Sequence, residues 1–371
     1  MTMAADKQDK VLNVPTMRFP EFSGEWKKYK LGDIMEFTKE RISSSLLTED
    51  NYVSTENMLQ DFQGITHAHN IPEDTNVMEY KQGDVLVSNI RPYLKKIWMA
   101  DKDGGCSADV FVMRANRNVC TDDFLHHIVA NDRFIGYVMS GAKGVKMPRG
   151  DKEQMKGFKT ALPSLKEQHK VAHLLAIIDE RISTQIRIID KLQSLMKGLA
   201  EHLTEFTPNT KIADCLNCHS SVLQENQVKS EGKYKVYGAN GICGYSDKPA
   251  ILEDAILIVK DGSGVGNVSY ASGEYSVIGT SNYLTAKSGY SLKYLYYCLM
   301  VFNFIPYKTG MAIPHIYFKD YRKALIYCPS LDKQVQIASL LSKIECKIEA
   351  DKAIADFYQQ QKRFLLQSMF I

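Results

Sequence analysis

Hydrophobic residues recur at alternating spacings of four and three positions in two long segments of the chain. The first stripe consists of Val171, Leu175, Ile178, Ile182, Gln185, Ile189, Leu192, Met196, Leu199 and Leu203. The second stripe consists of Ile337, Leu341, Ile344, Ile348, Asp351, Ala355, Tyr358, Lys362, Leu365 and Met369. This heptad spacing predicts two long helices, each of about 36 residues, or about 54 Å at a rise of 1.5 Å per residue.

Each predicted helix has two ways to bury its stripe. A lone amphipathic helix usually packs on its own globular domain, but two stripes of matching length favour pairing of the helices with each other. Gln185 and Asp351 interrupt the stripes at equivalent positions, 166 residues apart. A polar pair at that level can fix the register of paired helices, as buried polar residues do in coiled coils.

An internal repeat organises the chain. The motif Pro-Ser-Leu-x-x-Gln occurs at 163–168 and again at 329–334, an offset of 166 residues, and precedes a predicted helix each time. Met147-Pro148 and Ile313-Pro314 share this offset. We therefore interpret the chain as a duplicated unit of globular domain plus helix. The predicted boundaries are a first domain with an amino-terminal arm at 1–161, a first helix at 162–205, a second domain at 206–328 and a second helix at 329–371.

The globular segments carry a mixed pattern, which predicts an α+β fold. Short β-branched runs at 84–88 and 255–259 predict buried strands. Segments 124–139 and 292–304 predict helices. The glycine spacing at 262–266 is similar to that of a dinucleotide-binding loop, but a strand pattern follows it where such a loop would open a helix. A turn between strands is therefore predicted there.

Charge and composition narrow the class of protein only slightly. Lys and Arg total 46 against 43 for Asp and Glu, a net charge of +3, which permits nucleic-acid binding without requiring it. The 44% of hydrophobic residues disfavours a disordered protein. No apolar run reaches the roughly 18 residues of a membrane span, and the polar start of the chain lacks the apolar core of a signal peptide. We therefore expect a cytoplasmic protein with reduced cysteines.

Signatures of catalysis and of metal binding are missing or incomplete. The sequence has no Gly-x-x-x-x-Gly-Lys-Ser/Thr phosphate loop, no His-Glu-x-x-His and no Gly-x-Ser-x-Gly. It also lacks the Asn-Pro-Pro-aromatic motif of amino-methyltransferases, so the chain is not expected to methylate DNA by itself. Cys215-x-x-Cys218-His219 is similar to half of a zinc site, but no second Cys/His pair follows at finger spacing, which favours ordinary thiols and no metal.

Basic and aromatic residues gather in loops at corresponding places of the two repeats. Loops rich in Arg, Lys, Asn and His suit phosphates and base edges. One such run is more often a solvated surface, but runs in both repeats favour contact with DNA. The candidate DNA-binding residues are Arg91, Tyr93, Lys95, Lys96, Lys143, Lys146, Arg149, Lys260, Asn267, Lys308 and His315.

The order of these features resembles the specificity subunits of type I restriction-modification systems. The similarity lies in the opening segment from Val14 to Ile34, in the two Pro-Ser-Leu-x-x-Gln motifs before long helices, and in the closing segment from Leu365 to Ile371. It extends over nearly the whole chain. Each motif is short, but their order and duplication are specific.

The resemblance implies two similar target-recognition domains separated by two long helices, which form an antiparallel coiled coil and give the chain a pseudo-two-fold internal repeat. Each domain would read one half of an interrupted, asymmetric site in double-stranded DNA. The implied partners are two methyltransferase subunits, which bring S-adenosylmethionine, and restriction subunits, which use ATP and Mg²⁺. This chain would bind no cofactor and no membrane. The expected coiled-coil seam comprises Leu175, Ile178, Ile182, Ile189, Leu192, Ile337, Leu341, Ile344 and Ile348.

Two other functions stay open at this point. One is a stand-alone DNA-modifying enzyme, either a nuclease or a methyltransferase, which the missing motifs disfavour. The other is a coiled-coil adaptor without a role on DNA. Labelled S-adenosylmethionine added to the purified chain tests the first alternative, and salt-dependent retention of DNA tests the second.

Overall fold

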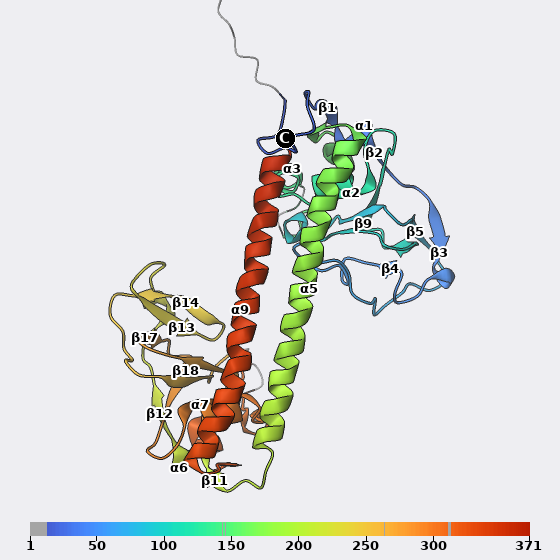
Figure 1. The fold of residues 1–371 in the computed structure, drawn as a ribbon. Helices are drawn as coiled ribbons and strands as arrows, with labels where there is room; N and C mark the ends of the chain where they lie inside the picture. Colours follow the sequence, from blue (N-terminus) through green and yellow to red (C-terminus); the bar gives the residue numbers. More distant parts are fainter. Residues whose placement is uncertain (1–12, 143, 145, 263, 311–312) are drawn as a thin grey trace, which may run out of the picture. The chain divides into compact units, whose positions relative to one another are not determined.

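The computed structural model describes residues 13–142, 144, 146–262, 264–310 and 313–371 (Figure 1). The chain divides into two compact units. Unit 1 comprises Met1–Ser183 with Asp356–Ile371, and unit 2 comprises Thr184–Ala355. The two long helices, α5 (Leu165–Thr204) and α9 (Leu331–Met369), therefore contribute residues to both units.

Unit 1 contains three small sheets with helices packed against them. The central sheet has the strand order β2-β9-β6-β7 and is antiparallel throughout; a second sheet has the order β3-β5-β8-β4, and β1 pairs with β10. The strands are β1 (Lys27–Lys30), β2 (Met35–Phe37), β3 (Arg41–Ser43), β4 (Tyr52–Val53), β5 (Asn76–Tyr80), β6 (Val85–Ser88), β7 (Ile97–Met99), β8 (Gly104–Cys106), β9 (Val110–Ala115) and β10 (Lys159–Leu162). The helices are α1 (Leu31–Ile34), α2 (Asp122–Val129), α3 (Asp132–Ser140) and α4 (Lys152–Lys156), with the 3-10 turns η1 (Ser44–Leu46) and η2 (Pro92–Leu94).

Two predictions for unit 1 have different outcomes. The buried strand predicted at 84–88 is confirmed, because β6 is buried along its whole length. The single helix predicted over 124–139 is wrong, because α2 and α3 are separate helices. The side-chain oxygen of Asn131 accepts a hydrogen bond from the backbone N–H of Arg133 at 2.9 Å. This cap begins a new helix, although the apolar pattern continues through both helices.

Unit 2 has a similar construction. Its main sheet has the order β12-β18-β15-β16, a second sheet has the order β14-β13-β17, and β11 pairs with β19. The strands are β11 (Thr210–Lys211), β12 (Leu216–Ser220), β13 (Tyr234–Gly238), β14 (Gly241–Ser246), β15 (Ala255–Val259), β16 (Val268–Ala271), β17 (Tyr275–Val277), β18 (Ser281–Ala286) and β19 (Leu325–Ile326). The helices are α6 (Ile212–Cys215), α7 (Leu292–Met300) and α8 (Phe318–Tyr321), with the 3-10 turns η3 (Glu225–Gln227) and η4 (Ile305–Tyr307).

The predicted internal repeat is confirmed by the order of strands in the two main sheets. Strands β2, β9, β6 and β7 correspond in chain order to β12, β18, β15 and β16. The buried strand predicted at 255–259 is β15, and the glycine segment after it is the predicted turn, since β15 pairs with β16. The helix predicted at 292–304 ends earlier, at Met300. Between α7 and α8 the described residues form only the turn η4, where unit 1 has α3.

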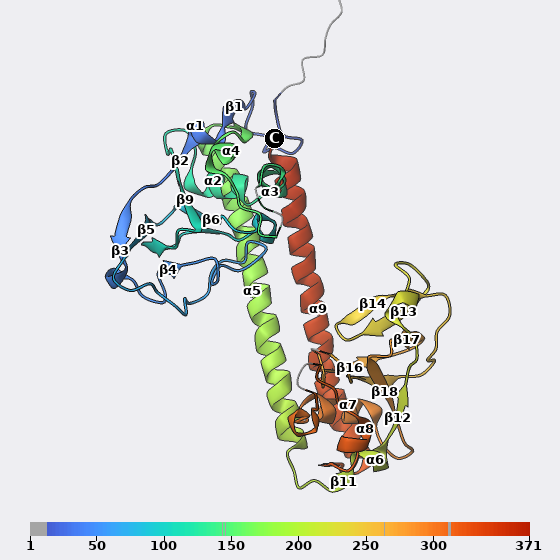
Figure 2. The ribbon, with the colours of Figure 1, turned by 180° about the vertical axis from the view of Figure 1, so that it is seen from behind.

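In unit 1 the beginning of α5 packs beside the end of α9 (Figures 1 and 2). Leu175 lies in one hydrophobic core with Leu365 and Met369. Lys362 and Asp179 form an ion pair between the two helices, with Nζ and Oδ1 2.6 Å apart. Residues early in one helix therefore meet residues late in the other, which is antiparallel pairing.

In unit 2 the end of α5 packs beside the beginning of α9. Ala200 shares a hydrophobic core with Ile337 and Leu341, and Met196 and Leu199 pack against it. The predicted helix pairing is thus confirmed, although each helix also packs on globular domains. All expected seam residues are buried or half-buried: Leu175, Ile178, Ile182, Ile189, Leu192, Ile337, Leu341, Ile344 and Ile348.

The two polar seam positions differ in their surroundings. Asp351 is 1% exposed and accepts a hydrogen bond from Lys347 of its own helix at 2.6 Å. Gln185 is half-buried, and no hydrogen bond joins it to Asp351 in the described part of the chain. A register-setting polar pair stays a prediction. Among the described residues, no helix combines the length and the apolar character needed to cross a membrane.

Candidate nucleic-acid interface

Unit 1 brings together two segments that carry predicted DNA-contact residues, which we call loop pair 1. The segment 89–96 follows β6, and the segment 146–150 follows α3. The backbone N–H of Arg91 donates to the carbonyl of Pro148 at 2.8 Å, and the N–H of Gly150 donates to the carbonyl of Asn89 at 3.1 Å. The two segments therefore form one surface, although they are distant in sequence.

Unit 2 repeats this arrangement in segments 260–267 and 309–316, which we call loop pair 2. The backbone N–H of Gly262 donates to the carbonyl of Pro314 at 3.0 Å, and the N–H of Ile316 donates to the carbonyl of Lys260 at 2.9 Å. His315 forms bridges with Asp261 and with Thr309. The same backbone frame thus holds the predicted contact residues of both repeats.

The two loop pairs also share backbone conformation. Arg91 and Lys95 have φ of 51° and 54°, and the corresponding Gly262 and Gly266 have φ of 96° and 88°. All four are in the left-handed region, which glycine adopts freely and which costs other residues roughly 1 kcal/mol each. Unit 1 therefore holds two cationic side chains at strained positions where unit 2 has glycine, a pattern that marks functional loops.

Three cations of loop pair 1 have partners within the protein. Lys95 forms an ion pair with Asp132 at 2.7 Å, and Arg149 forms one with Asp109 at 3.2 Å. The ammonium group of Lys96 donates to the carbonyl of Thr55 at 2.6 Å. The Lys95 and Arg149 pairs are solvent-accessible, so they are weak and can be exchanged for contacts to a ligand.

The other predicted DNA-contact residues of loop pair 1 that the structure describes are exposed to solvent. The side chains of Arg91 and Lys146 are exposed and make no hydrogen bond or ion pair with another described residue, and Tyr93 is also exposed. Lys143, predicted to belong here, lies outside the described residues. None of these roles in DNA contact is tested by the fold itself, and they stay predictions.

Loop pair 2 presents fewer charges. Asn267 and Lys308 are exposed, and Lys260 is half-buried. A Cβ atom at Gly266 would lie 3.5 Å from Cε of Lys308, so the Lys308 side chain lies beside the turn. The Nδ1 atom of His315 lies 3.0 Å from the carbonyl oxygen of Ile313 and donates to it, which leaves Nε2 for another partner.

Sequence reasoning did not single out two glycines that shape the loop pairs. Gly144 and Gly310 have φ of 97° and 86°, and Cβ atoms there would lie 3.1 Å from the carbonyl oxygen of Met147 and 2.3 Å from that of Ile313. Their common offset of 166 residues was the available signal. A side chain at Gly310 would clash with this carbonyl, the contact at Gly144 is tight, and the positive φ favours glycine at both positions.

The half zinc motif does not converge on a metal site. Cys218 lies against the hydrophobic core of unit 2, and burial raises the pKa of its thiol to about 11. His219 follows it in β12 and stacks on Tyr283, with ring centroids 4.8 Å apart. Successive side chains of a strand face opposite sides of the sheet. The described residues contain no group of three or more His, Cys, Asp and Glu side chains that could hold a metal ion.

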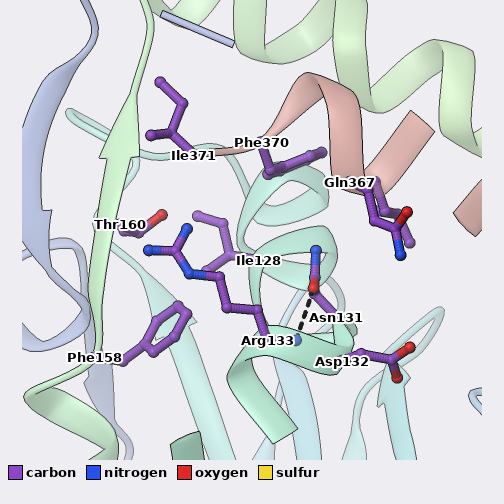
Figure 3. A pocket seen from close by; sticks show the side chains of 10 residues that line it. Ile128, Asn131, Asp132, Arg133, Phe158, Thr160, Gln367, Phe370 and Ile371 are labelled. Atoms are coloured by element: carbon purple, nitrogen blue, oxygen red, sulfur yellow. Dashed lines mark hydrogen bonds between the residues drawn. The ribbon is translucent and has the colours of Figure 1, made fainter. Parts of the chain in front are cut away.

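A cavity of about 310 Å³ in unit 1 lies where α2, α3, β10 and the end of α9 meet (Figure 3). Ile128, Phe158 and Phe370 are among its lining residues, and the Arg133 guanidinium lies 5.7 Å from the centre of the Phe158 ring. None of the predicted DNA-contact residues lines it. We therefore assign the cavity to the packing of α9 on unit 1.

Proteins with the same fold have been solved. A crystal structure of a type I restriction-modification system S subunit from M. genitalium superimposes with a TM-score of 0.67 at 16% identity, covering 96% of this chain and 99% of that chain. A structure concerning complex assembly and conformational transition of a type I R-M system gives a TM-score of 0.52 at 19% identity, covering 92% of this chain and 96% of that chain.

Similarity in sequence points in the same direction. The HindI specificity subunit of Haemophilus influenzae is 21% identical over 209 residues, which are 54% of this chain and 45% of the relative. The EcoprrI specificity subunit of Escherichia coli is 24% identical over 112 residues, which are 30% of this chain and 28% of the relative. The matches thus span less than half the length of these curated relatives.

A family model decides the assignment. The model described as type I restriction modification DNA specificity domain matches residues 23–194 and again 210–356, once for each repeat. The two matches together cover most of the chain, and each contains one loop pair. The protein therefore belongs to the family of type I restriction-modification DNA specificity domains.

Proposed function

We propose that this chain reads a split DNA target, one half-site for each unit, as the sequence-recognition subunit of a type I restriction-modification complex. The observation that carries the proposal is the duplicated loop pair. The same backbone hydrogen bonds recur in both units, while the side chains differ. In the alignment of the repeats, Arg91 corresponds to Gly262 and Arg149 corresponds to His315. Two equal frames with different side chains suit two different half-sites and hence an asymmetric target.

The chemistry of modification would belong to other subunits. The sequence lacks the Asn-Pro-Pro-aromatic motif of amino-methyltransferases, and in this proposal the chain contributes binding and no catalytic group. Methyltransferase subunits would bring S-adenosylmethionine, restriction subunits would use ATP and Mg²⁺, and this chain would bind no cofactor. The complex would act in the cytoplasm.

The long helices offer a surface for such partners. Each buries one face and exposes large apolar side chains on the others. They include Ile177, Ile186, Ile188 and Leu195 of α5 and Leu340, Ile354, Phe357 and Phe364 of α9. Exposed apolar side chains that gather on a surface are typical of protein interfaces. We propose that two methyltransferase subunits bind along these helices.

Mapping of methylated adenines tests the proposal directly. Cells that express the methyltransferase subunits with this chain should methylate one motif made of two specific parts and an unspecified spacer, and cells without it should not. A motif that persists in the absence of the chain would contradict the proposal. Methyl transfer from labelled S-adenosylmethionine by the purified chain would instead support a stand-alone enzyme, and assembled complex without salt-dependent DNA retention would support an adaptor.

A further inference from the structure

Both loop pairs expose one large apolar side chain at the same position. Met147 is 47% exposed and Ile313 is 66% exposed, and they correspond at the offset of 166 residues. Each stands directly before the proline whose carbonyl accepts the hydrogen bond that joins the two segments of its loop pair. Both repeats thus have an apolar residue at this place, although the residue after the proline differs between them.

Described residues beside Met147 and Ile313 make backbone contacts with the rest of each loop pair. Gly144 and Gly310 pack against the carbonyl groups of Met147 and Ile313, and Pro148 and Pro314 restrict the backbone of the residue that precedes them. A backbone that is already ordered by such contacts loses less conformational freedom when it binds. The fold thus presents a pre-positioned apolar contact rather than a loosely exposed residue.

The surroundings are those of a nucleic-acid surface. The residue after the proline is Arg149 in unit 1 and His315 in unit 2; Arg91 belongs to loop pair 1, and Lys308 lies beside loop pair 2. An apolar side chain among cations suits the floor of the major groove, where thymine presents a methyl group beside the phosphates that bind the cations. A protein interface would instead be depleted of charge at its centre.

We propose that Met147 and Ile313 are specificity-determining residues, each making an apolar contact with a base of its own half-site, as with the methyl group of thymine. The inference rests on the proposed function and adds the residues by which each unit discriminates. In this proposal each half-site of the target is contacted by one apolar side chain.

The test uses the complete complex with methyltransferase subunits and reads the methylated motif in cells. Met147→Ala should relax a base position in one half-site only, and Ile313→Ala should relax a position in the other half only. Leu46→Ala in unit 1 and Leu252→Ala in unit 2 are matched controls, because both remove an exposed apolar side chain outside the loop pairs; their motifs should equal that of the unaltered protein.

Several outcomes separate this inference from the proposed function. If the unaltered complex methylates a split motif and both alanine variants retain it with equal stringency, the inference fails while the proposed function stands. If the unaltered complex yields no split motif, the proposed function fails. Alanine variants that no longer bind methyltransferase subunits would show a protein contact and overturn the inference.

A variant that assembles but methylates no site needs one further measurement. Binding of the purified complex to a duplex containing the unaltered target should fall at least several-fold for Met147→Ala and recover for Met147→Leu, which keeps the apolar volume. Recovery supports an apolar contact. Equal weakness of the Leu and Ala variants would contradict it.

Discussion

The side-chain oxygen of Gln168 accepts a hydrogen bond from the backbone N–H of Thr121, the residue that caps α2, at 3.0 Å. Gln334 makes the same bond in unit 2, to the N–H of Ser291 that caps α7, at 2.9 Å. Both glutamines are buried. The glutamine of each Pro-Ser-Leu-x-x-Gln motif thus ties the start of a long helix to the start of a domain helix.

Replacement of Gln168 by Leu should destabilise unit 1. The Gln168 amide also donates to the carbonyl groups of Val119 and Pro163, so the change leaves three backbone groups without their partner. Such groups cost about 1–3 kcal/mol each when buried, and we expect a total loss of roughly 2–5 kcal/mol. Urea unfolding followed by circular dichroism measures it. His169→Leu, at the exposed neighbour, should change little; equal effects of both changes would contradict the account.

The ion pair between Arg18 and Glu167 should hold the amino-terminal arm on α5. Two guanidinium nitrogens of Arg18 donate to both oxygens of Glu167 at 2.7 Å, and Glu167 is 2% exposed. Arg18→Ala would leave a buried carboxylate without its counter-charge, a cost of about 3–5 kcal/mol. The exposed pair of Lys170 and Glu21 is the control, and Lys170→Ala should cost less than about 1 kcal/mol. Thermal unfolding compares the two, and the prediction fails if their effects are alike.

Acid should weaken unit 1 through His127. Burial, and then the charges of His126 and Lys362, lower the pKa of His127 well below its ordinary 6.5, although a hydrogen bond to Ala172 opposes the shift. His127 therefore binds a proton near pH 6.5 in the unfolded chain but stays neutral at that pH in the folded chain. Stability is full above that pH and falls below it, by about 2 kcal/mol at pH 5.

Two histidine variants separate the contribution of His127 to this pH dependence from that of other groups. In His127→Leu the stability lost between pH 7 and pH 5 should be smaller by about that amount, as measured by urea unfolding at each pH. His173→Gln changes an exposed histidine of α5 and should keep the slope of the unaltered protein. If the stability of His127→Leu depends on pH as strongly as that of the unaltered protein, His127 does not cause the loss of stability in acid.

Arg91→Gly should stabilise the fold and weaken DNA binding. The left-handed backbone at Arg91 costs roughly 1 kcal/mol, which glycine removes, and the exposed Arg91 side chain makes no hydrogen bond or ion pair with the described residues that would be lost. The complex should at the same time bind DNA more weakly, with a salt slope reduced by up to about 0.9 for one phosphate contact. Thermal unfolding and binding at several salt concentrations measure both effects. Unchanged binding would remove Arg91 from the interface.

A charge in the seam should disrupt the pairing of α5 with α9. Ile182 packs against the core of unit 1, so Ile182→Asp places an unpaired carboxylate in an apolar environment, at a cost of about 3 kcal/mol or more. We expect lower solubility and loss of co-purification with methyltransferase subunits. Ala176→Asp introduces the same charge at an exposed position of the same helix and should be tolerated. Normal assembly of the Ile182 variant would contradict the role of the seam.

The sequence by itself determined the helix pair and the duplication. The heptad stripes and the repeated Pro-Ser-Leu-x-x-Gln motif are local signals, because side-chain direction repeats with the turn of a helix. The break between α2 and α3 was missed, because the apolar pattern continues through Asn131 while a single capping bond decides where a helix begins.

Only the tertiary structure decided which core each helix end joins and which loop segments meet. Leu365 and Met369 complete the core of unit 1, and Pro148 accepts the hydrogen bond of Arg91. Both contacts join residues far apart in the chain, and their free energy comes from packing and hydrogen bonding that no local pattern records.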